Sequence, residues 1–396
     1  MTDSGPPPDT PHDPAPHDPA ADDAAADDGA PDDAARAAAT PRMDRRRLLR
    51  SGGLGGAMLL GGIALGRGSA QGQPLDTGGH DHADAAYSGG GNGGGGAGHA
   101  AHLPSDLERL GLVRGGYGHG PQPPRNLDEQ AVAAITHPPA FDGAAPGTVR
   151  DVALDVTATR WAVADGAVFD AWTYGGQVPG PVVRATSGDR LRIAVTNRTS
   201  QGHNLHLHGS HDPQMDGWQP IPAGSSFTYD LEAGPVGLHP YHCHLPPFAE
   251  HVRRGLHGTL IVDPPGGREP AVEVVLILSG FDLTGDGRND VYGYNGRCGL
   301  YDRHPIRVPV GELVRVYLVN FVEGEPLASF HLHAQTFDVY RSGTGTMPDE
   351  HTDQITLGQG DRAMLEFRLP SRGRYMFHPH QHHLVERGAM GWFTAV

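Results

Sequence analysis

From about residue 147 onward, the chain consists mainly of short runs in which apolar and polar residues alternate. Such runs occupy residues 152–157, 191–196 and 259–262. Side chains along a strand point alternately to the two faces of a sheet, so this period of two predicts strands with one buried face. Gly, Pro, Asn and Asp separate the runs at short intervals, and helical periodicity is weak throughout. The pattern therefore predicts an all-β fold built of β-sandwiches.

The predicted β region contains one internal repeat. Residues 188–197 and 311–320 each hold a glycine, an alternating strand and a final asparagine, and a His-Leu-His follows both. In each copy a second histidine pair begins 18 residues after a glycine, Gly224 or Gly360, and a Gly-x-x-Gly and a last strand come next. Two tandem domains with equivalent elements would produce this repeat. The expected domains are residues 147–265 and 268–396.

The first 146 residues have a different composition. Residues 1–42 hold ten aspartates and two arginines, a net charge of −8, which is half of the formal charge of −16. They contain almost no large apolar residue. That composition predicts a disordered acidic extension. Residues 71–146 begin with a Gly-rich stretch and carry scattered histidines, so we expect a flexible linker there. The acidity thus says little about the folded part, and no basic stripe suggests binding to nucleic acid.

Residues 43–70 have the layout of an export signal. A cluster of arginines is followed by two leucines, a Gly/Leu-rich apolar run and small residues. The adjacent arginines are typical of the twin-arginine type. The apolar run is short and Gly-rich for a bilayer span, so we expect cleavage near Ala70 and a mature protein that is exported to the periplasm or the exterior without a membrane anchor. Met43 is then an alternative start of the protein.

Four His-x-His pairs carry the candidate chemistry. They are His206 and His208, His242 and His244, His331 and His333, and His378 and His380. Residues i and i+2 of a strand share a face, so each pair aims two imidazoles in one direction. Only one pair encloses a cysteine, Cys243, whose thiolate then points the opposite way. This arrangement predicts two adjacent metal sites that are joined by one short piece of backbone.

A second ligand set lies on the cysteine side. His203 stands three residues before His206 and is expected to face the same way as Cys243, and His251 follows eight residues after Cys243. His203, Cys243 and His251 form a His₂Cys set, the ligand pattern of electron-transfer copper. The second domain has Ala328, Pro379 and Leu384 at the matching positions, so we expect the site in the first domain only.

These motifs resemble the multicopper oxidase family, which is built of cupredoxin domains. The resemblance rests on Tyr-Gly-Gly-Gln-Val-Pro-Gly-Pro at residues 174–181, His-Leu-His-Gly at 206–209 and His-Cys-His at 242–244. The family usually has three domains and this chain has two, so it resembles the two-domain, laccase-like branch, related in architecture to copper nitrite reductase. The resemblance implies one-electron oxidation of phenolic or similar donors, coupled to four-electron reduction of O₂ to water.

The resemblance also implies four coppers per chain. The type 1 copper would be held by His203, Cys243 and His251, with Leu256 at the axial position where relatives carry a weak methionine. Loss of that donor should raise the reduction potential. One type 2 and two type 3 coppers would be held by the eight paired histidines, His206 and His331 taking the type 2 ion. Electrons would pass through Cys243 to His242 and His244, and Asp212, Asp216 and Asp353 are candidates for orienting imidazoles.

Further implications concern assembly. By resemblance, two-domain members form a ring-shaped homotrimer in which the first domain of one chain faces the second domain of the next, so that the trinuclear clusters lie between subunits. A monomer with an internal domain interface is the alternative. A heterologous contact that closes into a ring is physically reasonable.

Three other functions remain open at this stage. A copper-containing nitrite reductase would share the architecture, but by resemblance it has an Asp in place of His206 and lacks the second imidazole of the His-Cys-His. A metal-ion oxidase acting on Cu(I), Fe(II) or Mn(II) would need acidic or Met residues near His251, where Glu250 is the one hint. A non-enzymatic periplasmic copper-binding protein is the third.

Three remaining residues are not counted as ligands: Cys298, expected to be a small buried hydrophobe, and His382 and His383.

Overall fold

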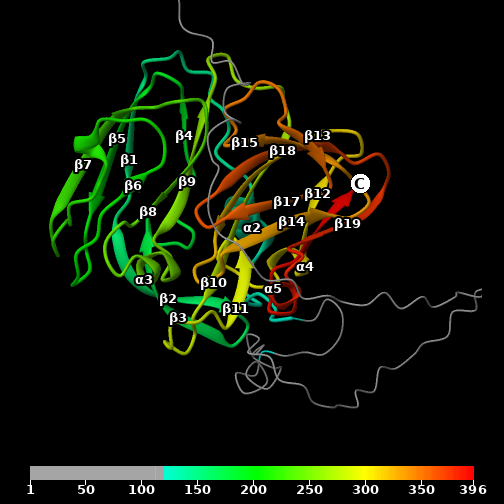
Figure 1. Cartoon of the computed structure of the whole chain (residues 1–396), viewed down its shortest axis with the longest axis horizontal. Helices are drawn as coiled ribbons and strands as arrows, with labels where there is room; N and C mark the ends of the chain where they lie inside the picture. Colours follow the sequence, from blue (N-terminus) through cyan, green and yellow to red (C-terminus); the bar gives the residue numbers. More distant parts are fainter. Residues whose placement is uncertain (1–111, 113–119) are drawn as a thin grey trace, which may run out of the picture. The chain divides into compact units, whose positions relative to one another are not determined.

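The computed structural model describes residue 112 and residues 120–396. The predicted acidic extension, the export signal and most of the linker lie outside the described residues. Within the described part, strands dominate and no helix exceeds eight residues (Figure 1). No helix in that part is both long and apolar enough to cross a membrane. The all-β prediction is confirmed.

The first domain is a β-sandwich with an added hairpin. One sheet has the order β1-β5-β7 and the other the order β4-β9-β8-β6, while β2 and β3 pair as a hairpin. The strands are β1 (Val149–Ala153), β2 (Val156–Ala164), β3 (Ala167–Tyr174), β4 (Val183–Thr186), β5 (Arg190–Thr196), β6 (His206–Leu207), β7 (Ser226–Glu232), β8 (Gly237–His242) and β9 (His257–Asp263). Two short helices join them, η1 (Pro213–Met215) and α3 (Phe248–Arg253).

The second domain packs a sheet of order β11-β10-β13-β18-β15-β16 against one of order β12-β20-β19-β14-β17. The strands are β10 (Val272–Phe281), β11 (Val291–Tyr294), β12 (His304–Val308), β13 (Leu313–Phe321), β14 (Leu327–Leu332), β15 (Phe337–Arg341), β16 (Glu350–Thr352), β17 (Gln354–Gly358), β18 (Arg362–Arg368), β19 (Gly373–His378) and β20 (Gly391–Ala395). Its helices are α4 (Leu300–Arg303) and α5 (His382–Glu386).

The sequence repeat corresponds to a repeat in the backbone. Gly224 and Gly360 both have positive φ, +74° and +72°, a conformation that favours glycine. Their amides donate to matching carbonyls, those of Asn197 and Asn320, each at 2.8 Å. These equivalent turns support two copies of one domain.

One strand prediction was wrong in its bounds. Residues 152–157 form no single strand, because β1 ends at Ala153 and β2 begins at Val156. Between them the Leu154 amide donates to the Ala194 carbonyl at 2.9 Å, after which the chain leaves that sheet for the β2–β3 hairpin. Leu154 and Val156 are both fully buried in the same core cluster. The alternating pattern at residues 152–157 therefore arises where the chain crosses from one sheet to another.

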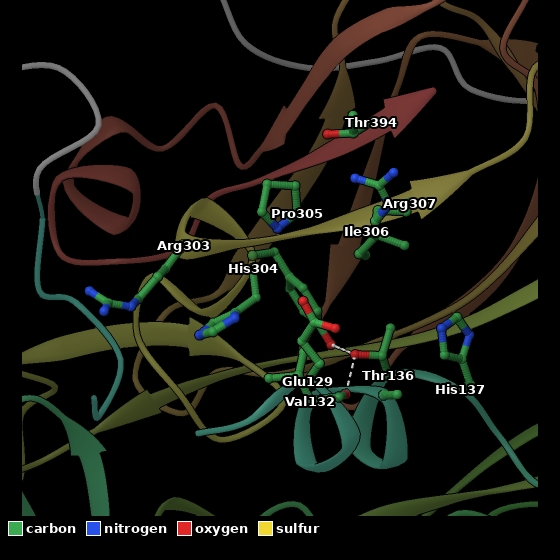
Figure 2. A pocket seen from close by; sticks show the side chains of 12 residues that line it. Glu129, Val132, Thr136, His137, Arg303, His304, Pro305, Ile306, Arg307 and Thr394 are labelled. Carbon is green, nitrogen blue, oxygen red and sulfur yellow. Dashed lines mark hydrogen bonds between the residues drawn. The ribbon is translucent and has the colours of Figure 1, made fainter. Parts of the chain in front are cut away.

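The flexible-linker prediction was wrong for residues 120–146. These residues include helix α2 (Glu129–Thr136), whose first turn is capped by the Asp128 carboxylate accepting from the Ala131 amide at 2.7 Å. Val132 is buried in the core of the second domain, and the Thr136 hydroxyl hydrogen-bonds to Tyr301 at 3.0 Å. Figure 2 shows α2 beside His304 and Ile306, where a pocket of about 380 Å³ remains. This segment is part of the folded protein.

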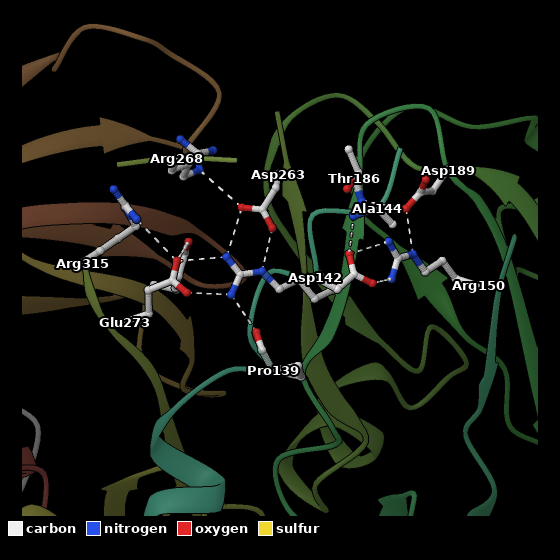
Figure 3. A network of polar contacts seen from close by, with 12 residues as sticks. Pro139, Asp142, Ala144, Arg150, Thr186, Asp189, Asp263, Arg268, Glu273 and Arg315 are labelled. Carbon is white, nitrogen blue, oxygen red and sulfur yellow. Dashed lines mark hydrogen bonds and ion pairs between the residues drawn. The ribbon is translucent and has the colours of Figure 1, made fainter. Parts of the chain in front are cut away.

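A buried apolar cluster and an ionic network join the two domains. The cluster combines Leu238, Val252 and Ile261 with residues of β10, β13 and β18. In the network, the Arg184 guanidinium binds Asp263 of its own domain and Glu273 of the second, with shortest distances of 2.6 Å to each (Figure 3). The domains are therefore held in one arrangement within the chain.

Arg184→Met is expected to lower the free energy of unfolding by about 3 kcal/mol, because it removes the nearest cation from two carboxylates in a largely buried network and leaves them only Arg268, 3.8 Å from Asp263, and Arg315, 3.4 Å from Glu273. The Arg184 and Asp263 side chains are only 7% and 0% exposed. Arg192→Met removes a surface pair with Asp151, 46% and 68% exposed, and should lower the stability far less, because solvent screens that pair. Urea unfolding of the copper-free variants measures both. Equal costs would contradict the role given to the network.

Candidate metal centre

The structure brings His203, Cys243 and His251 together in the first domain. The Cys243 Sγ lies 3.1 Å from the His251 Nδ1 and 4.0 Å from the His203 Nδ1, and the two Nδ1 atoms are 3.2 Å apart. All three residues are buried, and Leu256 is fully buried beside them. One sulfur and two nitrogens converge on one point from neighbouring elements.

Three backbone elements place this set. Cys243 directly follows β8, and its amide donates to the Leu256 carbonyl at 3.0 Å. His203 is bridged to Ile221 by two backbone hydrogen bonds. His251 lies on α3, a helix that was not predicted from the sequence. Leu256 and Cys243 belong to the same buried cluster, and the Leu256 side chain supplies no donor atom.

The electrostatics of the set suit a bound cation. Burial raises the pKa of the Cys243 thiol to about 11 and lowers the pKa of His203 to about 4. The imidazole is therefore neutral at pH 7, which is the form that binds metal, while a thiolate in this place needs a positive charge beside it. Soft sulfur with two imidazoles is the donor set that copper prefers, so the residues fit the ion.

The second domain cannot form this set. Ala328 and Leu384 occupy the matching positions and belong to its hydrophobic core, and Pro379 is also buried. Among the described residues, only the first domain holds such a His₂Cys set. Cys298 is a free, fully buried cysteine in an apolar cluster, as expected.

The first histidine quartet forms across two paired strands. His206 of β6 is in register with His242 of β8, so the two histidine pairs lie next to each other. The Nδ1 atoms of His206 and His242 lie 3.1 and 3.0 Å from the carbonyls of Asp216 and Cys243. A carbonyl only accepts, so each Nδ1 carries the proton and Nε2 is left as the ligand atom.

The second quartet repeats this arrangement in the other domain. His331 of β14 is in register with His378 of β19. Their Nδ1 atoms lie 2.9 and 2.8 Å from the carbonyls of Asp353 and Pro379. The tautomers are therefore fixed in the same way, and the two quartets are equivalent half-sites.

Within each quartet two Nε2 atoms face each other. The distance is 3.2 Å between His208 and His242, and 2.8 Å between His333 and His378. The Nε2 atoms of His242 and His378 each carry a free lone pair, because the protons of these rings lie on Nδ1. An N–H of His208 or His333 can donate to each of these lone pairs, and a bound cation could take the place of that proton, so the geometry suits one metal ion at each pair.

The two quartets do not meet within the chain. Among residues 120–396, each quartet makes ring contacts within itself, and none joins one quartet to the other. From the second domain it is Phe321 and Gly360 that lie beside the first quartet, against His242 and His208. In each quartet at least one imidazole is exposed: His244, His333 and His380. Each domain therefore presents one histidine quartet at its surface.

The copper-free protein is expected to lose stability as the pH falls from 6.5 toward 4. Burial, with neighbouring imidazoles adding to it, lowers the pKa of His203 and His242 to about 4 and of His208 to about 3. Between these values and 6.5 the unfolded chain binds more protons than the folded protein, at roughly 1.4 kcal/mol per pH unit for each group. Urea midpoints measured at pH 7 and pH 5 test this, and equal midpoints would contradict it.

The carboxylate of Asp216 orients one imidazole, whereas that of Asp353 lies too far from its histidine for a hydrogen bond. The Asp216 backbone carbonyl binds the His206 Nδ1, and the Asp216 carboxylate lies 3.0 Å from the same nitrogen. The carboxylate also lies 3.3 Å from the His211 Nε2. The Asp353 carboxylate is 3.8 Å from the His331 Nδ1. Asp212 instead caps η1 by accepting from the Gln214 amide. His383 pairs with Glu325 at 3.2 Å, away from the quartet, and His382 stacks loosely on His380.

Two residues that the sequence did not point to also belong to the site. The Asn204 side chain accepts from the His244 amide at 2.7 Å and so ties the two metal-ligand segments together. Its position next to His203 was the available signal. The Trp172 indole contacts both His203 and His251 at 4.9 Å between ring centres, a contact between distant segments.

Comparison with known proteins agrees with this geometry. Two family models, both described as multicopper oxidase, match residues 155–267 and 273–396, together more than half of the chain. This chain belongs to the multicopper oxidase family. Each match corresponds to one of the two sandwiches, so the two-domain organisation of this multicopper oxidase accounts for the whole folded repeat.

Three relatives indicate its position in the family. A solved multicopper oxidase structure is 38% identical, with a TM-score of 0.64, over 67% of this chain and 96% of that one. A copper nitrite reductase from Nitrosomonas europaea is 29% identical, with a TM-score of 0.59, over 63% and 94%. The copper-containing nitrite reductase of Neisseria meningitidis serogroup B is 27% identical over 289 residues, 65% of this chain and 73% of that protein. Oxidases and reductases are both similar to this chain.

Proposed function

We propose that this multicopper oxidase is a laccase-like enzyme, which takes single electrons from phenolic or similar donors and reduces O₂ to water. The observation that carries the proposal is the completeness of the two quartets, eight imidazoles in matched geometry with His206 present. A nitrite reductase needs one three-histidine ion and would leave His206 and His244 without a purpose. The bound coppers would supply four one-electron steps, the number that full reduction of O₂ requires.

Each group of residues has a defined task in this proposal. His203, Cys243 and His251 would hold the type 1 copper. The eight paired histidines would hold one type 2 and two type 3 coppers, with His206 and His331 on the type 2 ion. Cys243 lies between His242 and His244 in the sequence, so charge has a covalent route between the two centres. Asp216 holds the His206 ring in place and, through His211, offers a path for protons.

The separation of the quartets supports assembly from several chains. The interdomain network and apolar cluster hold the two half-sites apart within one chain, and each half-site has exposed imidazoles. A second copy would complete each site by bringing its other quartet. A closed ring of three chains satisfies every half-site by one repeated contact. We further propose that residues 43–70 export the protein through the twin-arginine route.

Copper quantitation with EPR tests the proposed function. We expect about four coppers per chain, with one blue signal, one type 2 signal and a coupled, EPR-silent pair. Two coppers per chain and no silent pair, together with nitrite turnover, would favour a nitrite reductase instead.

Leu256→Met is expected to lower the reduction potential of the blue centre. Leu256 is fully buried beside Cys243 and offers no donor, whereas a methionine thioether would stabilise the oxidised ion. The two side chains have similar volume, so packing should change little. Redox titration of the visible band gives the potential. An unchanged potential would refute the axial assignment.

A further inference from the structure

The imidazoles of the His₂Cys set are sealed from solvent. His203 is 0% exposed and His251 is 4% exposed, so a donor molecule cannot rest on either ring. The Trp172 indole covers both, with ring centres 4.9 Å from each and interplanar angles of 66° and 55°. Trp172 is itself buried, and the Arg254 guanidinium lies over its face at 4.5 Å. Arg254 is the outermost member of this stack, with a side chain 38% exposed.

The backbone fixes this stack. The Trp172 amide on β3 donates to the Arg254 carbonyl at 2.9 Å, which ties the hairpin to the turn after α3. Gly255 has a φ of +109°, and a Cβ there would approach the Trp172 carbonyl to 2.9 Å, so glycine permits the close contact. Glu250 binds the Arg254 Nε at 3.0 Å from one helical turn away. The indole therefore has little freedom to move off the imidazoles.

We propose that Arg254 and Trp172 form the donor site of this enzyme, selective for planar aromatic donors that carry a carboxylate or sulfonate. The guanidinium is partly exposed and can bind such anions through the N–H donors that Glu250 leaves free, while its outer face can accept an aromatic ring; the buried Trp172 supports its inner face. A phenolic donor would lose one electron and its hydroxyl proton, the proton going to solvent and the electron reducing the blue centre. The indole itself is not oxidised. Its contacts with both imidazoles fill the space between the donor and these two rings with packed atoms.

The positive charge of Arg254 also disfavours one class of donor, metal cations. A metal cation approaching this edge meets Arg254, and the carboxylate of Glu250 is already engaged by it. This selectivity rests on the proposed oxidase function, since it concerns the donor of the same reaction. Arg254 would bind the donor, and Trp172 would act as a positioning residue between the donor and the two imidazoles.

Anaerobic stopped-flow reduction of the oxidised, copper-loaded protein tests the proposal with two donors, a methoxyphenol carboxylate and its methyl ester. Arg254→Gln should slow bleaching of the blue band by the carboxylate about tenfold and leave the ester rate nearly unchanged. Arg192→Gln removes the same charge at an exposed site on β5 and should change neither rate. Trp172→Phe and Trp172→Leu should slow both donors several-fold, with copper content and visible spectrum retained.

A second readout does not depend on copper. Calorimetry on the copper-free protein should detect binding of a redox-inactive methoxybenzoate, weakened about tenfold by Arg254→Gln. Equal effects of Arg254→Gln on the two donors, or wild-type rates in both Trp172 variants, would overturn the inference. Because these rates are measured without oxygen, they do not depend on O₂ reduction. A blue centre that the donors reduce, in a protein that consumes no O₂ once air is admitted, would refute the oxidase and leave the donor site standing.

Discussion

Cys243→Ser is expected to abolish the blue absorption and to lower donor oxidation by roughly a thousandfold or more, the scale on which loss of an essential catalytic group acts. In the proposed enzyme a copper-bound thiolate would be the source of the colour, and Cys243 is covalently joined to His242 and His244 of the first quartet. The eight paired histidines are untouched, so about three coppers per chain should remain bound. Visible spectra, copper quantitation and O₂ uptake measure the three expectations together.

Cys298→Ser is the matched control for that variant. Cys298 is equally buried and lies in an apolar cluster outside both ligand sets. Its replacement should cost some stability, because a hydroxyl enters an apolar environment, and leave colour and turnover intact. A Cys243→Ser protein that oxidises donors at the normal rate would contradict the role of this residue as the link between the centres.

Mixing two inactive variants should restore activity. His208→Ala breaks a first-domain quartet and His333→Ala breaks a second-domain quartet, so each protein alone is expected to lose O₂ reduction. If a site forms from one quartet of each of two neighbouring chains, random assembly of equal amounts regenerates about a quarter of the intact sites. Co-expression followed by O₂ uptake measures the recovery, with copper-loaded wild type as the reference.

The control for this experiment is a chain that carries both substitutions, co-expressed with His208→Ala. No pair of such chains can supply an intact site by the interchain route, because every first-domain quartet is broken. Recovery in the test mixture and none in the control would support sites shared between chains. Failure of the test mixture to recover, while light scattering shows mixed assemblies, would contradict the interchain site.

Much of the site could be predicted because its ligands are local in sequence. The spacing of two in each histidine pair fixes the shared face of a strand, and the repeat then makes the four pairs two equivalent sets. The set of His203, Cys243 and His251 followed from the same alternation, although His251 proved to lie on a helix. Short-range patterns of this kind survive an error in the exact secondary structure.

What could not be predicted depends on contacts between distant segments. The position of Trp172 over the imidazoles comes from docking of the hairpin against the turn after α3, and no spacing in the sequence encodes it. Helix α2 was missed because it is only eight residues long and its flanks are rich in Pro, Gly and His, although Asp128 is a recognisable helix cap. The crossing at residues 153–156 was mistaken for one strand because both faces it passes are buried.

The number of electrons delivered per O₂ consumed tests the central claim most directly. Simultaneous recording of donor oxidation and O₂ uptake by the copper-loaded protein should give about four electrons per O₂ and no hydrogen peroxide, because three coppers held by two quartets and one type 1 copper would together store the four electrons that full reduction needs. A ratio near two with peroxide released, or donor oxidation that requires nitrite and consumes no O₂, would contradict an oxidase built on these eight histidines.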